Sequence, residues 1–143
     1  MKIQRSFLSF LDSNGIKYSK TDNLVSFQQG DVVFLFLCDM KDPDFYRMVI
    51  PNIDVGVDVI SIVGVLNRLT KNYKVGKAES FGDKVWLVFE QFICDPNADN
   101  TSLYVRSIKI LSAMFNDLRE SVVKQTQDGL EHVNPTLNGQ QSQ

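Results

Sequence analysis

The chain has 143 residues, of which 43% are hydrophobic and 22% are charged, and its formal net charge is −2. A chain of this length and composition can bury enough surface to fold as one domain without a metal ion or a disulfide. The small negative charge argues against nucleic acid as a partner, because nucleic-acid binding draws much of its affinity from clustered Lys and Arg.

Two features of the sequence bear on location. The apolar cluster Phe7–Leu11 ends at Asp12, so it is too short for the apolar region of a signal peptide. The longest apolar run, 55–69, contains Asp58 and Arg68 and cannot cross a membrane. We therefore expect a cytoplasmic protein that makes no membrane contact. Cys38 and Cys94 both lie in apolar runs, where we expect buried free thiols and no disulfide.

The first half of the chain predicts one helix followed by short strands. Residues 3–14 carry apolar side chains at helical spacing, and Gly15 follows as a stop signal. The runs 16–18, 24–28 and 32–38 are rich in β-forming residues and are separated by turn residues, which is typical of antiparallel hairpins. A connection is expected at 39–44, because it contains Pro43, and a further strand at 45–50, ended by Pro51.

The second half predicts a helix, a hairpin and a final helix. Asp54 or Asp58 can cap a helix that reaches residue 73. Gly82-Asp83 separates the runs 74–81 and 84–94 and suits a type II′ hairpin turn. Thr101 or Ser102 is expected to cap the last helix, which should bury one apolar stripe, formed by Tyr104, Ile108, Leu111, Phe115, Leu118 and Val122. The polar composition from residue 125 onward predicts a disordered tail.

Together these elements predict an α+β fold with the order helix, antiparallel β-meander, helix, β-hairpin, C-terminal helix. We expect one domain over residues 1–124, followed by the polar tail at 125–143.

Part of this pattern resembles a known family. The resemblance depends on the strand ending at 46–51, the helix end Leu-Asn-Arg-Leu-Thr-Lys-Asn at 66–72, the segment Lys-Ala-Glu at 77–79, the hairpin around Gly82 and the closing helix. From Phe45 to about Lys124 the sequence is similar to the YbjN-like family of candidate sensory transduction regulators, whose fold is shared with type III secretion chaperones. The resemblance implies a scaffold, commonly dimeric, that holds another protein or a peptide, and it implies no enzymatic activity.

Motifs that carry chemistry are sparse. The sequence contains no phosphate-binding, acyl-transfer or zinc motif, and its single histidine, His132, lies in the polar tail. The loop at 95–101 has the alternating oxygen side chains of a calcium loop, but Asn100 and Arg106 stand where Gly and Glu are needed, so we expect a helix-capping turn. The acidic residues Asp39, Asp42 and Asp44 are interpreted as a solvated turn. We expect no catalytic residue, no cofactor and no metal site.

The most informative pattern is that two predicted strands are apolar on both faces. In 85–93 one face presents Val85, Leu87, Phe89 and Ile93, and the other presents Trp86, Val88 and Phe92. An antiparallel sheet with one wet face alternates apolar and polar residues, so the second face requires cover. Either the helices divide between both faces, or the face bearing Trp86, Val88 and Phe92 binds a protein partner or a second copy of the chain. The rival hypothesis is a small ligand-binding domain or a carboxylate-dependent enzyme, which would show a deep pocket with a carboxyl group of raised pKa.

Overall fold

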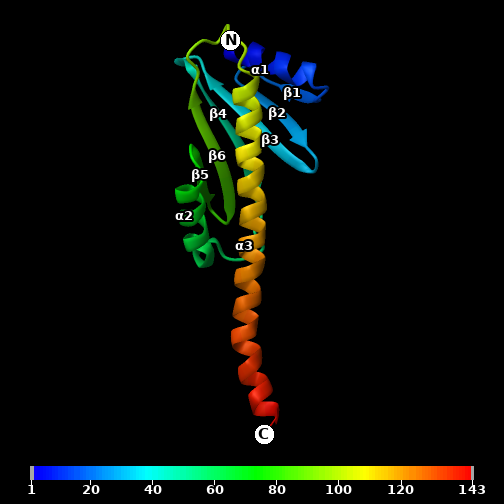
Figure 1. Cartoon of the computed structure of the whole chain (residues 1–143), viewed down its shortest axis with the longest axis vertical. Coiled ribbons are helices and arrows are strands. Elements are labelled where there is room, and N and C mark those ends of the chain that lie inside the picture. Colours follow the sequence, from blue (N-terminus) through cyan, green and yellow to red (C-terminus); the bar gives the residue numbers. More distant parts are fainter. Residues whose placement is uncertain (1, 143) are drawn as a thin grey trace.

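The computed structural model describes the backbone of residues 2–142 and the side chains of residues 2–128. The chain order of the elements is helix, four strands, helix, two strands, helix (Figure 1). Their bounds are α1 Lys2–Ser13, β1 Tyr18–Lys20, β2 Leu24–Gln29, β3 Val32–Asp39, β4 Asp42–Ile53, a 3₁₀ turn η1 Val59–Ile62, α2 Val63–Asn72, β5 Gly76–Phe81, β6 Lys84–Phe92 and α3 Thr101–Ser142. The predicted α+β class and its order of elements are confirmed.

The six strands form one antiparallel sheet in the order β1-β2-β3-β4-β6-β5. The meander β1 to β4 is continuous, and the hairpin β5-β6 adds to it through β6. Gly82 has a φ of +61°, which the first central residue of the expected type II′ turn requires and which an L side chain rarely adopts.

The helices lie on one face of the sheet, which we call the inner face. Phe7 of α1 stacks on Phe36 of β3 with ring centroids 4.0 Å apart, and Tyr104 of α3 meets both Phe7 and Tyr46 edge on. Buried residues of η1 and α2, among them Ile62 and Leu69, belong to the same core cluster. Within the described part of the chain the helices therefore do not divide between the two faces, and the opposite outer face carries no helix (Figure 1).

Strand β4 is longer than the sequence predicts, because neither proline ends it. The strand begins at Asp42 and includes Pro43, directly beside a bulge at the Cys38–Asp39 step of β3. Pro51 lies in a second bulge, between Ile50 and Ile53. A bulge leaves a residue out of the hydrogen-bonded ladder, so a proline without an N–H group is tolerated there. The expected connection at 39–44 is in fact a tight turn.

The middle helix is joined to α3 by a polar cluster. Asp58 caps its 3₁₀ start by accepting a hydrogen bond from the N–H of Ile60 at 3.1 Å. Arg68 of α2 forms an ion pair with Asp117 of α3 at 2.9 Å, and Tyr73 donates to the same carboxylate at 3.0 Å. The Arg68 guanidinium holds the pKa of Asp117 below its ordinary value. This cluster fixes α2 against α3 at the β5 edge of the sheet.

Helix α3 crosses the sheet and continues beyond it (Figure 1). Its buried side chains follow one stripe that ends at Val122, the last buried residue among those described: Tyr104, Ser107, Leu111, Met114, Leu118 and Val122. Ile108 and Phe115, which the sequence placed in this stripe, are only partly buried on its flank. The helical backbone reaches Ser142, whereas the sequence predicts a disordered tail from residue 125. Side chains are described only as far as Asp128, so the domain boundary at residue 124 stays a prediction.

A buried hydrogen bond between the sheet and α3 gives a test of this packing. Ser107 donates its proton to the carbonyl of Leu103 at 2.9 Å, so the Tyr46 hydroxyl must donate to Ser107. Both side chains are fully buried, and burial raises the pKa of Tyr46. We expect Ser107→Ala to lower the free energy of unfolding by about 1–3 kcal/mol, because it leaves a buried hydroxyl without an acceptor.

Tyr46→Phe should cost less, about 0.5–1.5 kcal/mol, because Ser107 keeps its bond to Leu103. Urea unfolding of both variants measures the difference. An equal or larger loss for Tyr46→Phe would contradict the assigned direction of the bond.

Candidate functional site

The outer face of the sheet is left uncovered by the helices over the described residues (Figure 1). Alternate residues of the strands β2 to β6 point to this face, and the register aligns Leu35 of β3 with Val49 of β4 and Val88 of β6. Val49 and Val88 are buried, yet they stand apart from the core cluster of the inner face. The apolar residues of the outer face are Leu24, Val33, Leu35, Leu37, Phe45, Val49, Phe81, Trp86, Val88 and Phe92.

Two aromatic pairs lie at opposite ends of the outer face. Phe45 and Phe92 are direct cross-strand partners with ring centroids 5.2 Å apart, and Phe92 is 63% exposed. At the other end, Phe81 and Trp86 lie 5.2 Å apart, and Phe81 is 55% exposed. Exposed aromatic side chains are costly to leave in water and are enriched at protein interfaces.

The bulge in β4 positions the Trp86 ring. Asn52 follows Pro51 in the bulge and has a φ of +53°, a conformation that asparagine tolerates better than most residues. Its side-chain oxygen accepts a hydrogen bond from the Trp86 indole at 3.2 Å. The polar edge of Trp86 is thereby satisfied, and its orientation on the face is fixed.

A charged row separates the two aromatic pairs. Glu90 of β6 forms ion pairs with Lys77 of β5 at 2.7 Å and with Arg47 of β4 at 3.3 Å. The hydrogen bond from Lys77, followed by that from Arg47, holds the pKa of Glu90 below its ordinary value. The aliphatic part of Lys77 lies opposite Val88 in the register, which explains why this valine is buried without a helix above it.

The three residues predicted to contact a partner therefore differ in accessibility. Trp86 and Phe92 share the outer face with Val88, as the alternation indicated. Val88, however, is only 3% exposed, so it packs beneath its neighbours and offers little surface for direct contact with a partner. Sequence reasoning missed Phe45, Phe81 and the charged row. The β4–β6 register that brings Phe45 and Arg47 to β6 has no local sequence signal, whereas the hairpin register set by the turn at Gly82 could have indicated Phe81.

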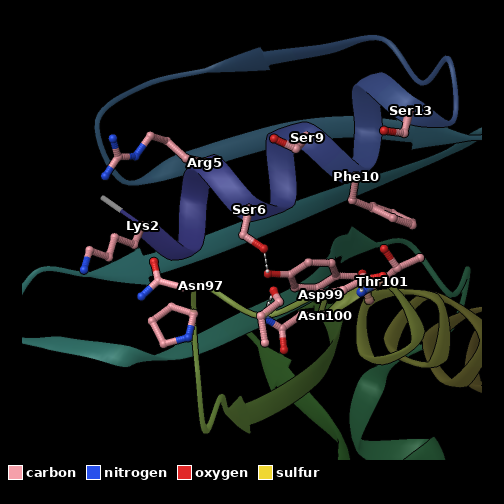
Figure 2. Close-up of a pocket in the computed structure, with 13 residues that line it drawn as sticks. Lys2, Arg5, Ser6, Ser9, Phe10, Ser13, Asn97, Asp99, Asn100 and Thr101 are labelled. Atoms are coloured by element: carbon pink, nitrogen blue, oxygen red, sulfur yellow. Dashed lines mark hydrogen bonds between the residues drawn. The ribbon is translucent and has the colours of Figure 1, made fainter.

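A separate polar pocket lies between α1 and the loop that precedes α3 (Figure 2). It has a volume of about 510 Å³, and its lining includes Lys2, Arg5, Ser9, Asn97 and Asp99. Figure 2 shows the hydrogen bond between the hydroxyls of Ser6 and Tyr104, 2.8 Å long, at its base.

The carboxylate of this pocket does not suit acid–base chemistry. Asp99 accepts a hydrogen bond from the N–H of Thr101 at 3.0 Å, and its interactions with Thr101 lower its pKa. Every carboxyl group with a resolved pKa shift in the described part of the chain is shifted downward, through a hydrogen bond or an ion pair. The rival enzyme hypothesis expected a raised value, so these groups do not favour it.

The remaining sequence motifs serve local structure. In the loop resembling a calcium site, Asp95 and Asp99 each accept a backbone N–H two residues further on, as helix-capping turns do. Asp39 accepts from the N–H of Lys41 in the tight turn before β4. Cys38 is buried as expected, whereas Cys94 is exposed because it lies past the end of β6. His132 lies outside the residues whose side chains are described.

Two further statements hold for the described residues. The side chains contain no group of three or more His, Cys, Asp or Glu arranged to hold a metal ion. Among the helices over residues 2–142, none combines the length and the apolar character that a membrane span requires.

The charged row gives a prediction on pH dependence. Because the pKa of Glu90 is lowered by folding, its ion pairs stabilise the protein above the ordinary carboxyl pKa, and this stabilisation is lost as the pH falls through the lowered value. Glu90→Gln should therefore reduce the free energy of unfolding at pH 7 by about 0.2–1 kcal/mol, and the difference from the native protein should shrink toward pH 3.

Urea unfolding at several pH values measures this difference. High salt provides the control, because screening should reduce the difference at pH 7. A difference that is independent of both pH and salt would show that Glu90 acts through packing instead of charge.

Comparison with known proteins bears on the fold. No protein-family model matches the sequence, and no curated protein matches it. Among solved structures, the crystal structure of YbjN from E. coli, described as a candidate transcription regulator, matches with a TM-score of 0.57 and 15% sequence identity. The match covers 85% of this chain and 93% of that chain, so it extends beyond the segment 45–124. At this identity the likeness concerns the fold alone, and it confirms the YbjN-like fold that the sequence resemblance predicted.

Proposed function

We propose that this protein is a non-enzymatic binding module that holds a protein or peptide partner on the outer face of its sheet. The observation that carries the proposal is the one-sided placement of the helices, which leaves apolar strands without cover. The two aromatic pairs expose apolar surface that no helix covers, and exposed apolar patches of this kind often mark interaction sites.

The arrangement of the outer face supports a protein partner. Two aromatic pairs flank a row of charged residues. The aromatic side chains can serve as apolar anchors, and the charged side chains can fix the position of a bound partner along the face. Trp86 is held by Asn52 before any partner arrives, which reduces the entropy lost on binding. A neutral to mildly charged partner surface fits better than a polyanion, because the row contains both signs.

The proposed role is chaperone-like or regulatory. The YbjN structure is described as that of a candidate transcription regulator, and this description supports a regulatory role without naming a partner. We propose that the protein acts in the cytoplasm as a homodimer. The free thiols of Cys38 and Cys94 suit the reducing conditions of that compartment.

The test is capture of partners by the tagged protein from its native lysate, with identification by mass spectrometry. We expect Trp86→Asp and Phe92→Asp each to abolish capture of the specific partner, because either change places a carboxylate within the apolar contact. Phe92 is mostly exposed, so its variant should keep the fold even where Trp86→Asp loses stability.

Ile60→Asp provides a matched control. Ile60 is 80% exposed but lies in η1, away from the outer face, so its replacement should leave capture unchanged. Circular dichroism checks that all variants are folded. Capture that survives both Trp86→Asp and Phe92→Asp would contradict a binding role for this face.

A further inference from the structure

One flank of α3 borders two adjoining hollows on the helix-bearing side of the molecule. The first has a volume of about 300 Å³ and lies between α3 and the β2–β3 turn. The second, about 460 Å³, continues along the exposed side of α3 toward its C-terminal end. Asn116 and Arg119 line both hollows, so together they form one groove. We call this surface the α3 groove.

The lining of the α3 groove is mixed, and Phe34 and Ile50 at its base are already buried by their neighbours. Phe34 and Ile50 of the inner sheet face line the groove, together with Val32 and the partly buried Phe115. One helical turn beyond Arg119, Val123 lines the second hollow and is 55% exposed. Phe115, Arg119 and Val123 follow one another at a spacing of four residues, so they share one side of the helix.

The charges of the α3 groove are balanced. Its lining includes two carboxylates, Asp31 and Glu120, and two cations, Arg119 and Lys124. None of these four side chains takes part in the ion pairs found among the described residues. A surface with equal numbers of both signs can pair with a copy of itself, whereas a one-sign surface would repel its copy.

We propose that the α3 groove of each chain is occupied by helix α3 of a second copy, packed antiparallel about a two-fold axis near Val123. The proposal rests on the homodimer proposed above and places its interface on the helical side, leaving the outer sheet face free for a partner.

The length of α3 argues for this occupant. The sheet supports α3 only as far as Val122, yet its helical backbone continues to Ser142, a further 20 residues or about 30 Å (Figure 1). In an antiparallel pair with its axis near Val123, this extension of each chain runs beside residues N-terminal to Val123 in the other, along the α3 groove. Most helical stability in proteins comes from packing and not from intrinsic propensity, so packing against a second helix would stabilise this extension.

The same geometry brings opposite charges near each other. In an antiparallel pair centred near Val123, Glu120 of one chain lies at the level of residue 126 of the other, about 3 Å along the helix from Lys124, so the two side chains can form an ion pair, and the two-fold axis repeats the contact. The side of α3 between Ser112 and Gln127 is only about 23 Å long, so the interface falls below the roughly 800 Å² per chain of a standard complex. We therefore expect a weak, concentration-dependent dimer.

Sedimentation velocity over a range of concentrations tests the proposal on the full chain. The native protein should show a monomer–dimer equilibrium, and Val123→Glu should weaken dimerisation by about tenfold or more, because it buries two uncompensated carboxylates at the axis. Val123 is exposed in the single chain, so the variant should keep its fold. Met40→Glu, at an exposed apolar position in the turn between β3 and β4, should leave the dimer unchanged.

Charge exchange tests the orientation of the two helices. Glu120→Lys and Lys124→Glu alone should each weaken the dimer, because like charges then face each other across the axis. The double variant Glu120→Lys with Lys124→Glu should restore it. In a Cys94→Ser background, Val123→Cys should form an intermolecular disulfide under mild oxidation.

Two outcomes would overturn the proposal. One is a native chain that stays monomeric at every concentration. The other is a dimer that Val123→Glu leaves intact. A dimer that is lost instead in Phe92→Asp would place self-association on the outer sheet face, while failure of partner capture with an intact α3 dimer would refute only the proposed function.

Discussion

The aromatic cluster that joins α1 and α3 to the sheet is the contact on which the rest of the structure depends. Phe7 lies flat against Phe36, and Tyr104 packs its edge against Phe7 and Tyr46. Aromatic pairs contribute about 0.5–1.5 kcal/mol each beyond the area that they bury, and their geometry is specific. Both helices make these contacts on the inner face. The outer face is therefore either exposed to solvent or covered by something outside the described part of the chain.

Much of the fold follows from local signals in the sequence. The turn glycine at 82, the stop at Gly15 and the capping residue Asp58 act through the backbone of their own segment, so their roles can be read without knowing the tertiary structure. The order of the elements follows from these signals. The resemblance to the YbjN-like family was detectable for the same reason, since it depends on the order and spacing of elements.

The candidate site was only partly predictable. Alternation in β6 correctly placed Trp86 and Phe92 on one face. It could not show that the helices pack on the opposite face, because that packing depends on the contacts of Phe7 and Tyr104 with residues that are distant in sequence. It also could not show that Val88 is covered by a neighbouring lysine, or that a bulge brings Asn52 to Trp86. Such facts depend on register, and one bulge changes register without a clear sequence signal.

The outer face and the α3 groove both result from the placement of all the helices on one face of the sheet. All the helices pack on the inner face of the six-stranded sheet, where a hollow remains beside α3, and within the described residues no helix covers the outer face. The outer face carries aromatic side chains at both ends and a row of paired charges between them, which suits a partner other than a second copy of α3. The α3 groove is narrow, follows a helix and carries balanced charges outside any ion pair seen among the described side chains, which suits a second copy of that helix. Since the surfaces lie on opposite sides of the sheet, a dimer formed through one would leave the other accessible, and each dimer would then present two outer faces to its partners.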